Sequence, residues 1–218
     1  TDKSVVYVNL YPNSHSTVNR GFYSNGSISA RNEGTGNVLG VYAPSGVEVE
    51  ALGNVSIEAP NAGVCALWKE GSGDVLSIGQ VEVSGKDAVG IKISSDNTTI
   101  GSYVTNEGSM IVNGTDSAKG VSFVTATNRS TALDNKGLID VTSENGSATG
   151  VHLKHNGVSN QHHKNSSQII TTGAQQAIGA LLDGDTSTDT YLDNSGEIRA
   201  QGILDYGGSS KIYGAWLG

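Results

Sequence analysis

A short motif returns along this chain at a nearly constant interval, and this period limits the fold more than any other feature. Its clearest copies read LDNKGLIDV from Leu133 and LDNSGEIRA from Leu192, and a third copy begins at Val104. Weaker copies, one with Ser167 in place of the glycine, extend the series of anchors to positions 26, 53, 79, 108, 137, 167 and 196. The intervals are 26 to 30 residues. Self-similarity at a fixed period of this size is typical of solenoid proteins.

A second motif lies between successive anchors and keeps nearly the same period. It is a glycine followed by alternating apolar positions, and its glycines are Gly40, Gly63, Gly90, Gly120, Gly150, Gly179 and Gly214. Because two different markers repeat together, the pattern is not a product of low sequence complexity.

Both motifs alternate apolar and polar residues, as a β-strand with one buried face does. Valine and isoleucine, whose branched side chains suit a pleated surface, dominate the inward positions of the first motif. These positions are Ile28, Ala30, Val55, Ile57, Val81, Val83, Met110, Val112, Ile139, Val141, Ile169, Thr171, Ile198 and Ala200. A shorter third strand, marked by Val104, Leu133 and Leu192, leads into the next anchor.

These strands predict an all-β chain that forms a right-handed parallel β-helix, or β-solenoid. We expect about seven rungs of 26 to 30 residues with three short strands each. In such a coil each residue stacks on its equivalent one period later, so Ile139 should lie beside Ile169; hairpin folds impose no such constant period. We expect one domain over residues 1–218, with an irregular leading segment at 1–24 and repeats over 25–218.

An asparagine stands two places before the anchor in four consecutive rungs. Asparagine tolerates tight turns, and stacked asparagine amides can hydrogen-bond from rung to rung. We therefore expect a ladder of Asn106, Asn135, Asn165 and Asn194. Asn25 is one place out of this register, so we expect an irregular first turn.

Composition and charge narrow the class of protein. Thirty glycines and 6% aromatic residues leave few large side chains for a globular core, although 36% hydrophobic residues are too many for a disordered chain. The net charge of −8 argues against nucleic acid as a partner. No apolar run is long enough to span a membrane. The single cysteine, Cys65, excludes an internal disulfide framework.

Two segments contain residues of the kind that bind metals. Four histidines, His152, His155, His162 and His163, fall close together, and the loop at 183–189 contains three aspartates. We interpret the histidines other than His152 as part of a solvated loop at 154–165, and the aspartates as solvated loop acids, because the loop lacks the turn glycine and bidentate glutamate of a calcium site. We expect no catalytic residue, metal or cofactor, and the sequence leaves metal binding by these two loops open.

Outward columns of the coil remain as the functional surface. The second motif should display Tyr42, Cys65, Lys92, Ser122, His152, Leu181 and Trp216. The first should display Ser29, Ser56, Glu82, Ile111, Asp140, Ile170 and Arg199. Our candidate binding residues are the outward Tyr42, Lys92, His152 and Trp216, together with the turn asparagines Asn106, Asn135, Asn165 and Asn194.

The repeated N-x-G-x-I-x-V, followed about a dozen residues later by A-x-G-V-x-L, resembles the passenger domains of Gram-negative autotransporters. These are secreted adhesins with a β-helical stalk, and the similarity covers nearly the whole chain from Asn25. The resemblance implies export through the outer membrane and display on the bacterial cell surface. It also implies adhesion, autoaggregation or biofilm formation. The partner would be a host surface or matrix protein, a glycan, or another copy of the chain.

The sequence lacks the carboxy-terminal barrel that anchors such proteins and stops inside a repeat at Trp216, so we expect a fragment of a longer passenger. Two alternatives to a non-catalytic adhesin stay open. One is a β-helical polysaccharide lyase or hydrolase, which would use paired carboxylates such as Asp183 and Asp185. The other is a structural segment of the phage-tailspike type, which would form obligate trimers.

Overall fold

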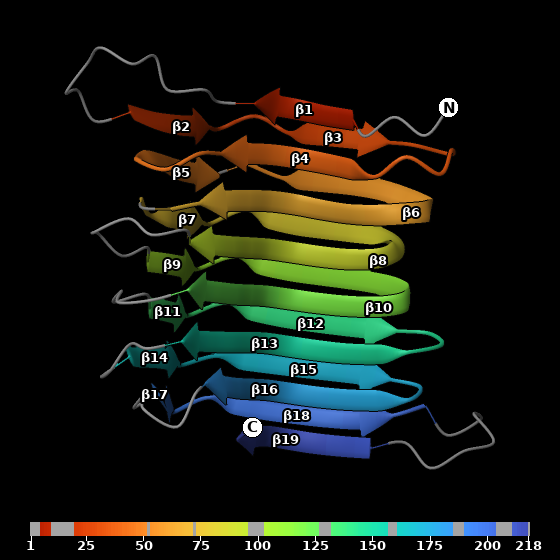
Figure 1. Cartoon of the computed structure of the whole chain (residues 1–218), viewed down its shortest axis with the longest axis vertical. Coiled ribbons are helices and arrows are strands. Elements are labelled where there is room, and N and C mark those ends of the chain that lie inside the picture. The colour runs from red at the N-terminus through yellow and green to blue at the C-terminus, as the bar shows by residue number, and fades with distance from the viewer. Residues whose placement is uncertain are drawn as a thin grey trace.

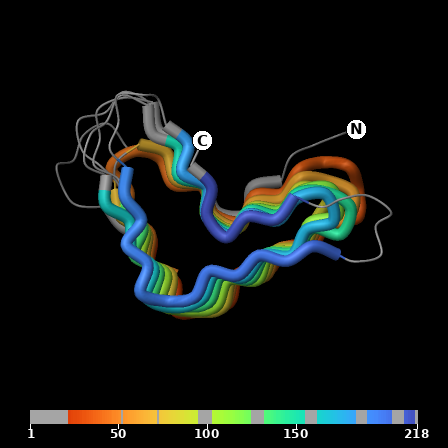
Figure 2. Tube along the Cα trace, turned by 90° about the horizontal axis from the view of Figure 1, so that it is seen from below, coloured from red at the N-terminus to blue at the C-terminus, as the bar shows by residue number. Residues whose placement is uncertain are grey.

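The computed structural model describes residues 5–9, 20–51, 53–71, 73–95, 103–126, 132–156, 161–184, 190–203 and 211–217. Every regular element in these ranges is a β-strand, and neighbouring strands pair in parallel. The chain winds as a right-handed coil whose turns stack along one axis (Figures 1 and 2). The predicted parallel β-solenoid is confirmed. Within the described ranges, no helix is long and apolar enough to cross a membrane.

The strands form three faces. The first face contains β3 (Ile28–Arg31), the beginnings of β6 (Val55–Glu70), β8 (Gln80–Ser95) and β10 (Ser109–Ala126), and then β12 (Leu138–Ser143), β15 (Gln168–Gly173) and β18 (Glu197–Gly202). The second face contains β1 (Val5–Asn9), β4 (Val38–Ala43), the ends of β6, β8 and β10, and then β13 (Ser147–Asn156), β16 (Gln176–Gly184) and β19 (Lys211–Leu217). The third face contains β2 (Arg20–Ser24), β5 (Val47–Ala51), β7 (Val75–Ser77), β9 (Tyr103–Asn106), β11 (Ala132–Asn135), β14 (Gln161–Asn165) and β17 (Thr190–Asn194).

The three faces differ in length. Strands β6, β8 and β10 pass from the first face into the second without a break, so these two faces form one 12-stranded sheet. The third face is a separate 7-stranded sheet. Seen along the axis, the first and second faces are two long walls, and the third face closes the wider end (Figure 2).

The number of turns differs from the expected number of rungs. The solenoid has about five turns, slightly fewer than the seven rungs expected from the anchors. An anchor marks only the entry into a rung. After the last anchor, Gly196, the described chain contributes β18 and β19 but no strand of the third face. This incomplete last rung accounts for part of the difference between the two counts.

The vertical register of the first motif is the predicted one. Ile139 lies between Met110 on one side and Ile169 on the other, and all three side chains are completely buried. The outward column from Ser29 to Arg199 is also in the expected register. Half of every first-motif strand therefore faces the core, and the other half faces outward.

The second motif is in the predicted register except at one position. Gly63 does not lie beside Gly40. Ala66 takes that place, because Leu39 pairs with Cys65 and Val41 pairs with Leu67. The register of β6 shifts between Ala59 and Gly63, where the strand turns the corner between two faces. The extra residues at this corner displace everything that follows.

The glycines of the second motif have a steric role. A Cβ atom on Gly150 would lie 2.3 Å from Cγ2 of Ile169, and one on Gly179 would lie 2.2 Å from Cγ2 of Ile198. The second wall dips toward the first along this glycine column (Figure 2). Ile57 and Ile139 lie against Gly40 and Gly120 in the same way, and Met110 lies against Gly90. This repeated contact explains why both motifs keep one period.

The asparagine ladder is confirmed. The Nδ2 atom of Asn106 donates to Oδ1 of Asn135 at 2.8 Å, Asn135 donates to Asn165 at 2.7 Å, and Asn165 donates to Asn194 at 2.7 Å. Asn106, Asn135 and Asn165 are completely buried. Ser24 and not Asn25 occupies the same column in the first turn, in register with Ala51.

Candidate ligand-binding groove on the second face

Two outward columns border the dip in the second face. The first contains Leu39, Cys65, Val89, Lys119, Thr149, Ile178 and Tyr213. The second contains Tyr42, Trp68, Lys92, Ser122, His152, Leu181 and Trp216. The glycine column between them lies close to the first wall, and the backbone of the second face dips inward (Figure 2).

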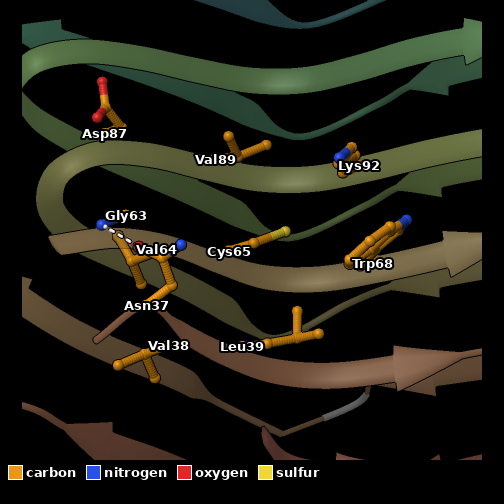
Figure 3. A pocket seen from close by; sticks show the side chains of 10 residues that line it. All are labelled: Asn37, Val38, Leu39, Gly63, Val64, Cys65, Trp68, Asp87, Val89 and Lys92. Atoms are coloured by element: carbon orange, nitrogen blue, oxygen red, sulfur yellow. Dashed lines mark hydrogen bonds between the residues drawn. The ribbon is translucent and has the colours of Figure 1, made fainter. Parts of the chain in front are cut away.

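A groove of about 370 Å³ occupies the part of this surface formed by β4, β6 and β8. Leu39, Cys65 and Val89, one from each strand, line its floor (Figure 3). Trp68 and Lys92 form one rim. The opposite rim contains Asp87 and Asn37, whose Oδ1 accepts a hydrogen bond from the backbone nitrogen of Gly63 at 2.9 Å. We call these residues the second-face groove.

Aromatic and charged side chains make the first rim rigid. Tyr42 and Trp68 meet edge to face, with ring centroids 5.6 Å apart. The Nζ atom of Lys92 lies 4.3 Å from the centre of the Trp68 ring, an arrangement worth about 0.5–1 kcal/mol at exposed sites. The indole nitrogen of Trp68 donates to Ser94 Oγ at 2.8 Å, and the Tyr42 hydroxyl donates to Glu70 at 2.5 Å. The rim is thus held before any ligand arrives.

The Cys65 thiol is unreactive in this position. Its thiol is half-buried and donates weakly to the backbone oxygen of Leu67 at 3.4 Å. Burial raises the pKa of Cys65 to about 12, although Lys92 acts in the opposite direction. The thiolate is the reactive form of cysteine, so a protonated Cys65 serves as an apolar part of the floor.

A second cluster lies farther along the same face. The Nε2 atom of His152 is 3.5 Å from Asp183 Oδ2, and Lys154 Nζ is 3.0 Å from the same oxygen. Burial lowers the pKa of His152, and the positive charge of Lys119 lowers it further, while Asp183 opposes this. The hydrogen bond from Lys154 lowers the pKa of Asp183. At neutral pH the cluster therefore contains a neutral imidazole between two lysines and one carboxylate.

The remaining histidines do not join this cluster. His162 is exposed on β14 and stacks on Tyr191 with ring centroids 4.9 Å apart. His163 is completely buried, and its Nδ1 accepts from the backbone nitrogen of Leu133 at 3.0 Å. The expectation of a solvated loop was wrong for residues 154–156, which end β13, and for residues 161–165, which form a third-face strand. The apolar and polar alternation did not reveal this strand, because a polar residue, His163, takes the inward place that Leu133 and Leu192 hold in the neighbouring rungs.

The described part of the chain contains no group of three or more His, Cys, Asp or Glu side chains that could hold a metal ion. The expectation of a solvated loop acid was wrong for Asp183, which lies at the end of β16 and pairs with Lys154. Residues 185–189 fall outside the ranges given above. The side chain of His155 also lies outside them.

The structure distributes the predicted binding residues over three places. Tyr42 and Lys92 both contact Trp68 at the groove. Trp68 occupies the place in this column that the sequence had predicted for Cys65. His152 lies farther along the face. Trp216 is 39% exposed on β19 and stacks on Tyr213, with centroids 4.9 Å apart.

Of the ladder asparagines, only Asn194 is exposed. The other three point into the coil, so a ligand on its outer surface does not reach them.

Sequence reasoning missed four residues of the second-face surface: Leu39, Trp68, Val89 and Lys119. An alignment of the second motif on Ala66 would have placed Trp68 between Tyr42 and Lys92. The apolar outward positions Leu39 and Val89 carry no such signal, because an isolated outward apolar residue is common in strands.

Comparisons with known proteins complete the description. No protein-family model matches this chain, and no curated protein or solved structure matches it.

Proposed function

We propose that this chain is a non-catalytic attachment domain, displayed on the surface of a bacterial cell, that binds its partner with the second-face groove. One observation carries the proposal. Leu39, Cys65 and Val89 form an apolar floor across three consecutive strands on the outside of the coil, between two polar rims. A recessed apolar surface with a few fixed polar groups is the usual form of a binding site.

The state of the polar groups in and near the groove supports binding without catalysis. Cys65 is protonated, the Tyr42 hydroxyl is engaged by Glu70, and the imidazole nitrogens of His152 are shielded from solvent. A nucleophile needs an activating base within reach, whereas the Cys65 thiol donates its hydrogen bond to the backbone oxygen of Leu67.

Autotransporter passenger identity belongs to the same proposal. The resemblance of the repeat supports it, and the parallel solenoid is the architecture that the resemblance implies. On this proposal the domain is secreted to the outer surface, where it mediates adhesion, autoaggregation or biofilm formation.

Display on a non-aggregating bacterium tests the proposal. Cells that carry the chain should settle faster, or should bind matrix or glycan-coated surfaces better, than cells that carry an unrelated domain. Val89→Glu places a charge in the groove floor and should abolish the effect. Ile78→Glu is the matched control, since Ile78 is an exposed apolar residue outside the groove. Equal loss in both variants, or no attachment by the original chain in any assay, would contradict the proposal.

A second candidate function is a polysaccharide-active enzyme. The observation in its favour is that Asp183 meets Lys154 and His152 on the groove face. Turnover of an acidic glycan that is lost in Asp183→Asn would establish this function in place of simple attachment.

A further inference from the structure

We propose that the second-face groove binds a linear acidic polysaccharide that lies along the coil axis. The inference rests on the proposed attachment function and names the class of partner. Three observations lead to it: the direction of the groove, the character of its floor, and the order of the lysines beside it.

The direction of the groove argues against an added peptide strand. Peptides that join a sheet need a free edge, but strands β6, β8, β10, β13 and β16 each pair on both sides within the second face. A partner in the groove therefore crosses the strands and contacts side chains. Rungs repeat about every 4.8 Å, whereas an extended peptide presents like side chains about every 6.8 Å. A sugar ring in an extended polysaccharide is about as long as one rung is high, so successive sugars can meet equivalent positions in successive rungs.

The floor is suited to the C–H faces of sugars. Leu39, Cys65 and Val89 form a continuous apolar strip, and the protonated thiol of Cys65 adds no charge to it. The polar groups lie at the rims, where hydroxyl groups of a sugar would point. This separation of an apolar floor from polar rims fits an amphipathic ring better than a fully polar or a fully apolar ligand.

The lysines supply the charge complementarity. Lys92 on β8 lines the groove, and Lys119 on β10 continues the floor column directly beside Val89. Lys154 on β13 lies in another column, five positions along the strand from the Lys119 column. Lys92 and Lys119 make no ion pair with any described residue, in a chain whose net charge is −8. A carboxylate or sulfate on one bound sugar would pair with Lys92 at the rim, and one on a sugar farther along the axis would pair with Lys119.

Acidic groups on the same face are already engaged. Asp183 is bound by Lys154, and Glu70 accepts from Tyr42. Asp87 on the far rim accepts from Ser117 Oγ at 2.6 Å. These contacts leave Lys92 and Lys119 as the cations available to an incoming anion.

Trp68 provides a direct readout, because the ammonium group of Lys92 lies over its ring. The chain has two tryptophans, so Trp216→Phe leaves Trp68 as the only one. We would titrate this variant with polygalacturonate oligomers, chondroitin sulfate, poly-glutamate and neutral cello-oligosaccharides, and follow fluorescence and binding heat. We expect saturable binding of the two acidic glycans that weakens as salt is added. Tighter binding of poly-glutamate or of the neutral sugars would overturn the inference.

Charge variants locate the site. Lys119→Gln should weaken acidic-glycan binding about five-fold, the upper range for a partly exposed ion pair. Lys164→Gln is the matched control, because Lys164 is an exposed lysine on the third face. Equal weakening in both variants would show non-specific attraction and refute the groove site.

The outcome also separates this inference from the proposed function. If displayed cells still attach while the purified chain binds neither acidic glycan, only the glycan inference fails. If glycans bind but displayed cells never attach, the attachment function fails.

Discussion

At the scale of single residues, the least expected feature is a lysine inside the coil. Lys69 is completely buried in a column with Ala43, Ile93 and Phe123. Its ammonium group donates to the backbone oxygens of Pro44 at 2.9 Å and Glu70 at 2.5 Å. The small side chain of Ala43 leaves room for it beside the turn that follows β6.

Lys69 should give the stability of the protein a defined pH dependence. Burial lowers the pKa of Lys69 from 10.5 to about 8. Between about pH 8 and 10.5 the unfolded chain binds a proton here that the folded chain does not, so the free energy of unfolding should rise with pH in this window. Lys69→Met should lose this rise. Urea unfolding of both proteins at pH 7.5, 8.5 and 9.5 measures it, and parallel curves would contradict the assignment.

The asparagine ladder allows a test of buried hydrogen bonds. Asn135→Ala removes the acceptor of Asn106 and the donor to Asn165, both inside the coil. Leaving buried polar groups unpaired costs about 1–3 kcal/mol, so we expect the free energy of unfolding to fall by about 2–3 kcal/mol. Asn194→Ala, at the exposed end of the ladder, should cost less than about 1 kcal/mol. Equal losses in denaturant unfolding would mean that the ladder is not a stabilising unit.

At the scale of strands, the two motifs share a period because a glycine of the second motif packs against an isoleucine of the first. The sequence showed that both motifs share a period, and the contact between Gly150 and Ile169 supplies the physical reason. Strand identity and vertical register were predictable because each strand stacks on its own equivalent. The corner in β6 was not predictable, since two extra residues at a bend change the register without changing the alternation. The strand around His163 was hidden for a similar reason: a histidine can fill an apolar position when its nitrogen finds a partner.

The close approach of the two walls predicts a large difference between two glycines. Gly150→Ala forces a Cβ atom against Ile169 and against the backbone oxygen of Gly179, at 2.4 Å. Overpacking of this kind costs about 1–3 kcal/mol. Gly26→Ala is the control, because nothing lies within 4 Å of a Cβ atom there. Thermal unfolding should show a lower midpoint for Gly150→Ala alone, since Gly→Ala at an open position restricts the unfolded chain and does not destabilise the protein. A similar drop in both variants would contradict the steric explanation.

At the scale of the whole molecule, the coil is a one-dimensional stack. Each strand pairs with its equivalents in the neighbouring turns, so the interior of every turn between the two ends is covered by the turns beside it. The outward surface was the least predictable part of the molecule. Alternation shows which residues point outward, but only the folded structure shows that Leu39, Cys65 and Val89 form the floor of a groove (Figure 3). The alternation of residues in the sequence carries no information about how far apart two outward columns lie in space.

This stacking predicts a gradient of local stability along the axis. Met110, Val112, Ile139 and Val141 in the middle turns are completely buried, whereas the side chains of β17, β18 and β19 that are described are half-buried or exposed. Local opening follows burial and pairing in repeat proteins. Hydrogen exchange followed by mass spectrometry should therefore show the slowest amides in β10 and β12 and much faster ones in β18 and β19.

The groove formed by β4, β6 and β8 lies outside the fast region, and a saturating acidic glycan should slow exchange in these three strands while leaving β18 unchanged. Uniform protection from β6 to β19 would mean that the coil unfolds as one unit, and the turns would then share their stability over the full length of the rod.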